Sequence, residues 1–154
     1  MTICYIASPV GRLALEADGE ALSVVRWAGE GESAPKSRAT PVLREAKHQL
    51  ERYFAGRLKK FDLPLAPHGT EFHKRVWALM SDIPFGETAT YGGMAMALSS
   101  GPRAVGRACG RNPIPIIVPC HRVLASGGKE GGYSGGQGLP TKRRLLALEG
   151  VVLL

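Results

Sequence analysis

The start of the chain alternates between short, largely apolar segments and polar turn signals. The apolar segments cover residues 3–6, 12–17 and 22–27, and Gly, Pro or Asp residues at 9–11 and 18–19 separate them. Apolar runs of this length between such residues predict strands joined by tight turns. We therefore expect a small antiparallel sheet.

Helical spacing of the apolar positions replaces this pattern from residue 41. It predicts one helix over residues 41–55, which Gly56 ends. Residues 28–40, before it, have the composition of an exposed loop. A short extended piece at residues 61–65 and a linker at 66–69 follow the helix.

Three further helices are predicted beyond the linker. Thr70 is an N-cap candidate for the first, which Pro84-Phe85-Gly86 ends. The second covers residues 91–98 and the third begins at Pro102 and runs to Cys109. The tight turn between these last two is typical of a helix-turn-helix.

The remaining chain contains seven glycines between Ser126 and Gly138 and an amphipathic helix over residues 141–149. The glycines predict a loop whose backbone can approach another molecule closely. We predict an α+β fold in two domains. Residues 1–66 form a small α/β domain with an antiparallel sheet and a helix, and residues 67–154 form a mostly helical domain with the helix-turn-helix.

Composition narrows the class of protein. No segment has the ~20 continuous apolar residues of a membrane span, and the start lacks a signal-peptide pattern. Cys4, Cys109 and Cys120 form neither a metal-binding spacing nor an even disulfide set, so we expect no metal and a cytoplasmic location.

The net charge of +7 is concentrated in the second half, where residues 69–154 hold 10 basic and 5 acidic side chains. Such an excess favours a polyanionic partner, although solubility alone would also account for it. Arg103, Arg107 and Arg111 are four residues apart and share one helical face. That face either contacts a polyanion or is simply solvated.

The segment Pro119-Cys120-His121-Arg122 carries the chemistry. It follows the apolar run of residues 114–118, which places the cysteine where a buried strand or turn ends. An imidazole can accept the thiol proton and a guanidinium can stabilise the thiolate, so these neighbours suit a nucleophile. The alternative is a structural cysteine at a strand end.

Taken together, these motifs resemble the O6-alkylguanine-DNA alkyltransferases, or methylated-DNA–protein-cysteine methyltransferases, across nearly the whole chain. The resemblance rests on the following segments: Ile117-Val118-Pro119-Cys120-His121-Arg122-Val123, Arg103-Ala104-Val105-Gly106, Asn112-Pro113, Pro84-Phe85-Gly86, Tyr91-Gly92, Gly132-Tyr133-Ser134-Gly135-Gly136, Leu145-Leu146 and Glu149-Gly150. Ser8-Pro9-Val10-Gly11 matches more loosely.

The resemblance implies repair of O6-alkylguanine, and of O4-alkylthymine, in double-stranded DNA. The protein would act as a monomer, flip the damaged base out of the helix and keep the alkyl group on Cys120. Because a thioether is stable, each molecule would react once, without a cofactor.

The resemblance also implies roles for single residues. Cys120 is the nucleophile, His121 and Glu149 form a relay to it through a water, and Tyr91 and Asn112 complete the catalytic set. DNA binding is assigned to Arg103, which fills the vacated base stack, and further to Tyr91, Ala104, Gly106 and Arg111. Substrate binding is assigned to Tyr91, Cys120, Val123, Tyr133 and Ser134.

Three other functions stay open at this stage. A non-catalytic alkyltransferase-like protein would bind the lesion without reacting, but such proteins carry another residue in place of Cys120. A helix-turn-helix transcription factor would need a dimerisation segment, which the sequence does not show. A cysteine hydrolase would need an oxyanion hole, which we cannot place.

Overall fold

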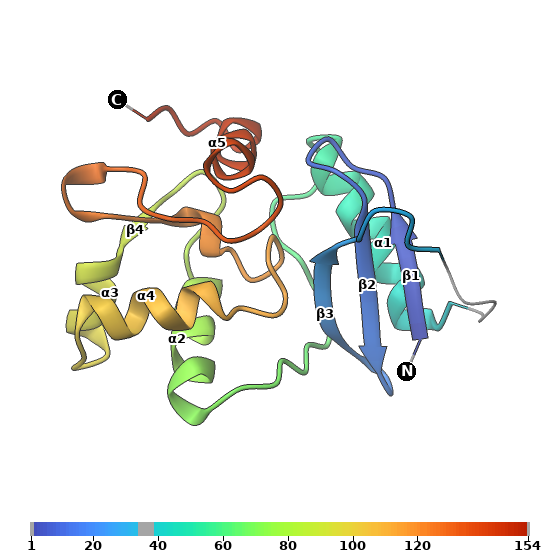
Figure 1. Cartoon of the computed structure of the whole chain (residues 1–154), viewed down its shortest axis with the longest axis horizontal. Coiled ribbons are helices and arrows are strands. Elements are labelled where there is room, and N and C mark those ends of the chain that lie inside the picture. The colour runs from blue at the N-terminus through green and yellow to red at the C-terminus, as the bar shows by residue number, and fades with distance from the viewer. Residues whose placement is uncertain (1, 34–38, 154) are drawn as a thin grey trace. The chain divides into compact units, whose positions relative to one another are not determined.

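The computed structural model describes residues 2–33 and 39–153, so the predicted loop at 28–40 lies partly outside the described residues. Internal contacts group the chain into two compact units, residues 1–68 and 69–154. Each unit has its own helices and strands (Figure 1). Each also has its own set of buried apolar side chains. The predicted α+β fold is confirmed.

The N-terminal unit contains the three predicted strands. They are β1 (Thr2–Ile6), β2 (Leu13–Asp18) and β3 (Ala21–Trp27), and they form one antiparallel sheet in the order β1-β2-β3. The register between β2 and β3 shifts at Glu16/Ala17, where the sheet has a bulge. The tight turn after Asp18 explains why two consecutive strands pair directly.

Helix α1 (Pro41–Phe54) packs against this sheet and supplies the other half of the core. Leu43 and Leu50, seven residues apart on one helical face, are fully buried. Gln49 on the same helix donates from Nε2 to the Asp62 carbonyl (2.9 Å) and accepts from the Asp62 N–H (2.9 Å). These two bonds hold the extended segment after the helix.

The C-terminal unit begins with α2 (Glu71–Ser81), capped as predicted: the Thr70 hydroxyl accepts a hydrogen bond from the His73 N–H at 3.1 Å. The helix ends at Ser81, before the predicted stop at Pro84. A proline disfavours helical geometry at the residue before it, so the helix has already ended when Pro84 is reached.

The helix-turn-helix consists of α3 (Tyr91–Ala97) and α4 (Pro102–Gly110). Ser99, in the turn between them, has a φ of 52°, in the left-handed region that reverses the chain tightly. The Trp77 indole N–H donates to the Ala108 carbonyl at 2.8 Å, inside the core. This bond fixes α4 against α2.

The segment before the cysteine is a turn, not a strand, which selects one of the two predicted alternatives. The apolar run of residues 114–118 is a buried turn, and Cys120 opens a single 3₁₀ turn, η1 (Cys120–Arg122). A two-residue strand, β5 (Val123–Leu124), follows the cysteine and pairs in parallel with β4 (Ala89–Thr90). Cys120 therefore follows a buried turn, which is one of the two predicted alternatives, and the strand comes after it.

The chain ends with the 3₁₀ turn η2 (Ser126–Gly128), a glycine-rich segment and α5 (Leu139–Leu148). Helix α5 begins two residues earlier than predicted because Pro140 occupies its first turn, where a proline is favoured. Within the described part of the chain, no helix is long and apolar enough to cross a membrane.

Candidate active site and nucleic-acid interface

The turn before Cys120 is fixed by one asparagine side chain. Asn112 donates from Nδ2 to the Val118 carbonyl (2.8 Å) and accepts the Ile114 N–H at Oδ1 (2.9 Å). Ile116 inside this turn has a φ of 76°, which is rare for a β-branched residue, and it is fully buried. Hydrogen bonding and packing therefore hold the strained turn that places Cys120.

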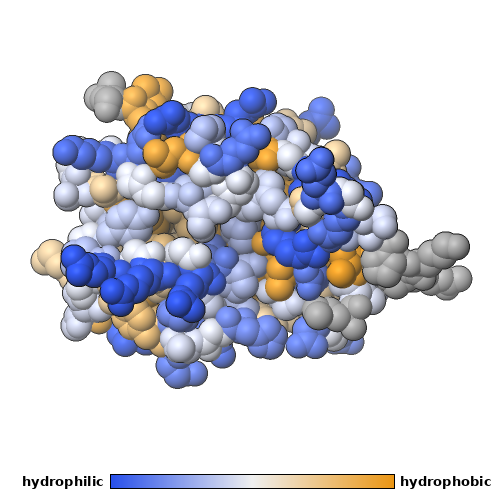
Figure 2. Space-filling model, in the orientation of Figure 1, coloured by the Kyte–Doolittle hydropathy of each residue, from blue (hydrophilic) through white to orange (hydrophobic). Residues whose placement is uncertain are grey.

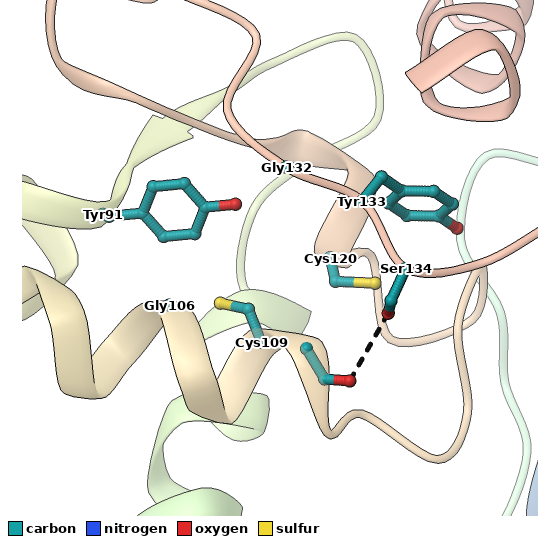
Figure 3. A pocket seen from close by; sticks show the side chains of 8 residues that line it. Tyr91, Gly106, Cys109, Cys120, Gly132, Tyr133 and Ser134 are labelled. Atoms are coloured by element: carbon teal, nitrogen blue, oxygen red, sulfur yellow. Dashed lines mark hydrogen bonds between the residues drawn. The ribbon is translucent and has the colours of Figure 1, made fainter. Parts of the chain in front are cut away.

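Cys120 lies in a cavity of about 470 Å³ within the C-terminal unit. The lining combines α3, α4, the 3₁₀ turn η1 and the glycine-rich segment, through Tyr91, Gly106, Cys109, Gly110, Cys120, Gly132, Tyr133 and Ser134. Figure 3 shows the tyrosine and both cysteines around the same space, with the glycine-rich segment passing over it. A cavity of this size accommodates a nucleobase-sized ligand.

The Cys120 thiol is held in its protonated form. Burial raises its pKa above the ordinary value of 9.0, whereas hydrogen bonding to Asn112 and the positive charge of Lys142 lower it. The net direction is upward, so the thiol form predominates near neutral pH. The reaction at Cys120 therefore needs a base that removes the proton.

His121 and Glu149 supply a candidate base. The His121 Nε2–H donates to Glu149 Oε2 at 2.8 Å, and both side chains are fully buried. Because an ionised carboxylate only accepts hydrogen bonds, Nε2 carries the ring proton and Nδ1 has the lone pair. Nδ1 is buried and makes no hydrogen bond to another described residue.

The charge state of His121 follows from its surroundings. Burial lowers the pKa of His121 below 6.5 more strongly than the Glu149 carboxylate raises it. The ring is therefore neutral near pH 7 and able to accept a proton.

Tyr91 stands at the N-terminus of α3. The Thr90 hydroxyl caps this helix by accepting from the Gly93 N–H at 3.0 Å. Burial raises the pKa of Tyr91 to about 12, so its hydroxyl stays protonated and can donate a hydrogen bond into the cavity. A Cβ added to Gly131 would lie 3.0 Å from the Tyr91 ring, which shows how closely the glycine-rich segment packs on it.

The glycine-rich segment is fastened by Lys142, which is completely buried in α5. Its ammonium donates to three backbone carbonyls, those of Val123 (2.7 Å), Glu130 (2.5 Å) and Gly132 (3.1 Å). An ammonium has three donors, and all three are used here. In addition, the Ser134 hydroxyl donates to the Gly110 carbonyl on α4 at 3.4 Å (Figure 3).

Helix α4 presents basic side chains to solvent. Arg103 and Arg107 are exposed, and Arg111, also exposed, caps the helix instead of lying within it. Figure 2 shows a band of hydrophilic side chains where Figure 1 draws α4. Ala104 and Gly106 lie between these arginines and are half-buried. Because both residues are small, no bulky side chain projects from the helix between the arginines.

The structure brings together most of the residues proposed for the chemistry. Those that line the cavity are Tyr91, Gly106, Cys120, Tyr133 and Ser134, while His121, Glu149 and Asn112 support it from behind. Val123, expected to contact the substrate, is fully buried in β5 and does not line the cavity.

The sequence led us to expect that the Arg122 guanidinium stabilises the thiolate, but its hydrogen bonds go to Glu149 and the Ile83 carbonyl, and the three bonds of Lys142 were not predicted. Arg122 forms a buried two-pronged ion pair with Glu149, at 2.8 Å (Nε–Oε1) and 3.0 Å (Nη2–Oε2). Arg122 and Lys142 are basic residues, a type that is ordinarily exposed, and both are buried here. Their burial is explained by their partners, a carboxylate for Arg122 and backbone carbonyls for Lys142. Within residues 2–33 and 39–153, no group of three or more His, Cys, Asp or Glu side chains is placed to hold a metal ion.

A helix-turn-helix next to a cavity with a cysteine and a buried His–Glu pair defines a class of nucleic-acid-associated protein with a cysteine nucleophile. Two family descriptions match the chain. The 6-O-methylguanine DNA methyltransferase DNA binding domain matches residues 71–151, and the ribonuclease-like domain of the same methyltransferases matches residues 1–67. The chain belongs to the 6-O-methylguanine DNA methyltransferase family.

Individual relatives agree with this assignment. A methylated-DNA–protein-cysteine methyltransferase of Methanosarcina acetivorans is 48% identical over 97% of this chain and 99% of its own length. One of Mycobacterium bovis is 44% identical over 94% of this chain and 89% of its own length. The crystal structure of Mycobacterium tuberculosis OGT in complex with DNA superposes with a TM-score of 0.85, at 43% identity, over 97% of this chain and 92% of that one.

Proposed function

We propose that this protein repairs O6-alkylguanine in double-stranded DNA by moving the alkyl group onto its own Cys120. The observation that carries the proposal is the position of Cys120 in a cavity beside the helix-turn-helix, in front of the buried His121–Glu149 pair. The names of the relatives and the DNA complex of the Mycobacterium tuberculosis protein support it. We extend the proposal to O4-alkylthymine.

Binding to DNA is assigned to the exposed face of α4. The O6 atom of a guanine is poorly accessible inside the stack, so the base has to leave the helix, which costs a few kcal/mol and least for a damaged pair. Arg103 fills the vacated position because its planar, permanently charged group can stack and pair with the orphaned base. Arg111 contacts phosphate, and the small residues Ala104 and Gly106 let the helix approach the DNA closely.

The transfer is a direct displacement at the alkyl carbon. His121 Nδ1 takes the Cys120 proton through a water, and the sulfur forms a bond to the carbon as the bond from carbon to the guanine oxygen breaks. The electron pair stays on the guanine, where Tyr91 donates a hydrogen bond to the developing charge. Because its pKa is raised to about 12, Tyr91 has that proton available.

The other assigned residues hold the substrate or the cysteine. Tyr133 and Ser134 line the cavity and contact the extruded base from the glycine-rich segment. Asn112 fixes the turn before Cys120. Val123 is buried in β5 and does not line the cavity, so we leave it out of the substrate-binding set.

One protein molecule repairs one lesion in this proposal. A thioether carries no leaving group that water could displace under mild conditions, so Cys120 is not regenerated and no cofactor takes part. Residues 67–154 form the domain that does this chemistry and residues 1–66 form the other domain. The three free cysteines support a reducing, cytoplasmic location. A purely lesion-binding role is not favoured, since Cys120 is present.

Intact-protein mass measurement tests the function. The purified protein is mixed with a duplex that contains O6-methylguanine, and we expect a gain of one methyl group on Cys120, complete at one equivalent. Cys120→Ser should gain nothing, whereas Cys109→Ala, which removes the other sulfur in the cavity, should still react. Product beyond one equivalent would indicate a conventional enzyme, and no mass change a binding protein.

A further inference from the structure

Arg122 occupies an unusual position behind the cavity. Its guanidinium forms the two bonds to Glu149 described above, and its Nη1 donates to the Ile83 carbonyl at 2.6 Å. The ring of Phe85 lies 5.9 Å from the guanidinium carbon. Arg122 is therefore held from three sides, and Glu149 Oε2 accepts from both Arg122 Nη2 and His121 Nε2.

We propose that Arg122 is a positioning residue that fixes where the protons of the His121–Glu149 pair reside: one on Nε2 of the imidazole, none on Nδ1 and none on the carboxylate. This inference rests on the proposed function, in which Nδ1 accepts the Cys120 proton. It adds a residue that does not touch the substrate, the cysteine or the water between them. Arg122 acts through its ion pair with Glu149 and through its charge beside His121.

The first step of the argument concerns the carboxylate. A fully buried carboxylate without a cation would bind a proton, because a low-dielectric environment disfavours its charge. Arg122 supplies a permanent charge in the forked geometry that matches both oxygens, which keeps Glu149 ionised. An ionised Glu149 accepts hydrogen bonds only, and this forces the His121 proton onto Nε2.

The second step concerns the imidazole. The charged groups that act on His121 are Glu149 at the end of α5, Arg122 in η1 and Lys142 in α5. Glu149 raises the pKa of His121, while Arg122 and Lys142 lower it. With Arg122 removed, only Lys142 still offsets the attraction of Glu149, so the His121–Glu149 pair takes up an additional proton at a higher pH than before. In that state Nδ1 no longer has a free lone pair for the cysteine proton.

Lys142 is also a buried cation near His121, but it is bonded differently. Its three donors all bind backbone carbonyls, those of Val123, Glu130 and Gly132. Lys142 therefore fastens the chain, whereas Arg122 is coupled directly to the group that orients the base. The two residues make a natural pair for comparison.

Nuclear magnetic resonance of the DNA-free protein tests the proposal. Protein with ¹⁵N-labelled histidine is titrated, and the His121 signal is identified by its loss in His121→Gln. We expect wild-type His121 to keep a protonated Nε2 and an unprotonated Nδ1 near neutral pH. In Arg122→Met, His121 should bind its second proton at least about tenfold more tightly, which is one pH unit.

The rate of transfer should follow the same shift. In Arg122→Met, the pH at which methylation of Cys120 reaches half its maximal rate should move upward by the same amount. Arg122→Lys keeps the positive charge but not the two-pronged geometry, so its shift should be at most half of that in Arg122→Met. If Arg122→Met does not fold, the smaller shift in Arg122→Lys is the measurement that tests the proposal. An unchanged His121 titration in a folded variant, even one with reduced activity, overturns the proposal.

This design separates the two hypotheses. The titration needs no DNA and no alkyl group, so it reports on Arg122 whether or not Cys120 is the acceptor. A wild-type protein that gains no methyl group would refute the proposed function and leave the proton placement standing. A normal methyl gain with no shift in Arg122→Met and Arg122→Lys would refute the proton placement alone.

Discussion

The Lys142 ammonium lies 2.7 Å from the Val123 carbonyl oxygen, and both residues are fully buried. Val123 directly follows the Cys-His-Arg turn, and Lys142 lies on α5, 19 residues further along the chain. The same nitrogen also binds the carbonyls of Glu130 and Gly132. One side chain therefore connects the cysteine-bearing turn, the glycine-rich segment and the last helix.

Replacing Lys142 by Met should destabilise the protein. Three carbonyls would lose their partner, and a buried polar group left without a hydrogen bond costs about 1–3 kcal/mol, so we expect a loss of about 2 kcal/mol or more in the free energy of unfolding. Chemical denaturation measures it. The neighbouring Arg143→Met, which removes an exposed ion pair with Glu130, should change little. Equal effects of the two variants would contradict the fastening role.

A single methyl group on Gly131 should disturb the cavity. Its φ is +70°, and a Cβ would lie 3.0 Å from Tyr91 Cε2, so Gly131→Ala is both strained and crowded. We expect a loss of about 1–3 kcal/mol in stability and slower methyl transfer. Gly132→Ala is the matched control, because nothing lies within 4 Å of its Cβ and its φ is not positive. Its stability should match that of the wild type, and a comparable loss there would refute the explanation.

The reactivity of Cys120 should rise with pH over a wide range. Burial raises the pKa of its thiol above 9.0, and only the thiolate attacks a simple alkylating agent. In a Cys4→Ser, Cys109→Ala background, the rate of modification by iodoacetamide should therefore still be increasing at pH 9.0. A plateau reached near neutral pH would mean that Cys120 is already ionised at rest.

Arg103 should matter for duplex DNA and not for an isolated base. Arg103→Ala should slow transfer from O6-methylguanine in a duplex by about tenfold or more, because nothing then fills the vacated stack. The rate with free O6-benzylguanine should remain close to that of the wild type. Arg107→Ala, an exposed arginine one helical turn away, serves as the control for lost positive charge. Equal losses with both substrates would refute the role of Arg103.

Much of the fold was predictable because its elements have strong local signals. The helix over residues 41–54 follows from regular apolar spacing, and Thr70 caps α2 as its position before an apolar run predicts. The strands β4 and β5 were not predictable, since two residues are too few to show any periodicity. Their pairing depends on tertiary structure that brings residues 89–90 to residues 123–124.

Site residues that belong to a sequence motif were predictable. Residues whose role depends on their tertiary environment were not. The Cys120-His121 neighbours mark a nucleophile and a base in the sequence itself. The partner of Arg122, by contrast, lies 27 residues away, and Lys142 sits on a helix among other basic residues that are exposed. No local pattern distinguishes a lysine that binds three carbonyls from one in solvent.

The short parallel pairing of β4 with β5 has a consequence for how the cavity can change. Ala89 pairs with Val123 and Thr90 with Leu124, so the residue that enters α3 and the residue that leaves the cysteine turn are joined by a ladder of two rungs. Tyr91 is the next residue on one side and Arg122 the preceding one on the other. A substitution at position 89 or 90 should therefore change the spacing between Tyr91 and Cys120, which both line the cavity, although neither substituted residue lines it. These two positions are candidates for engineering the range of alkyl groups that the protein accepts.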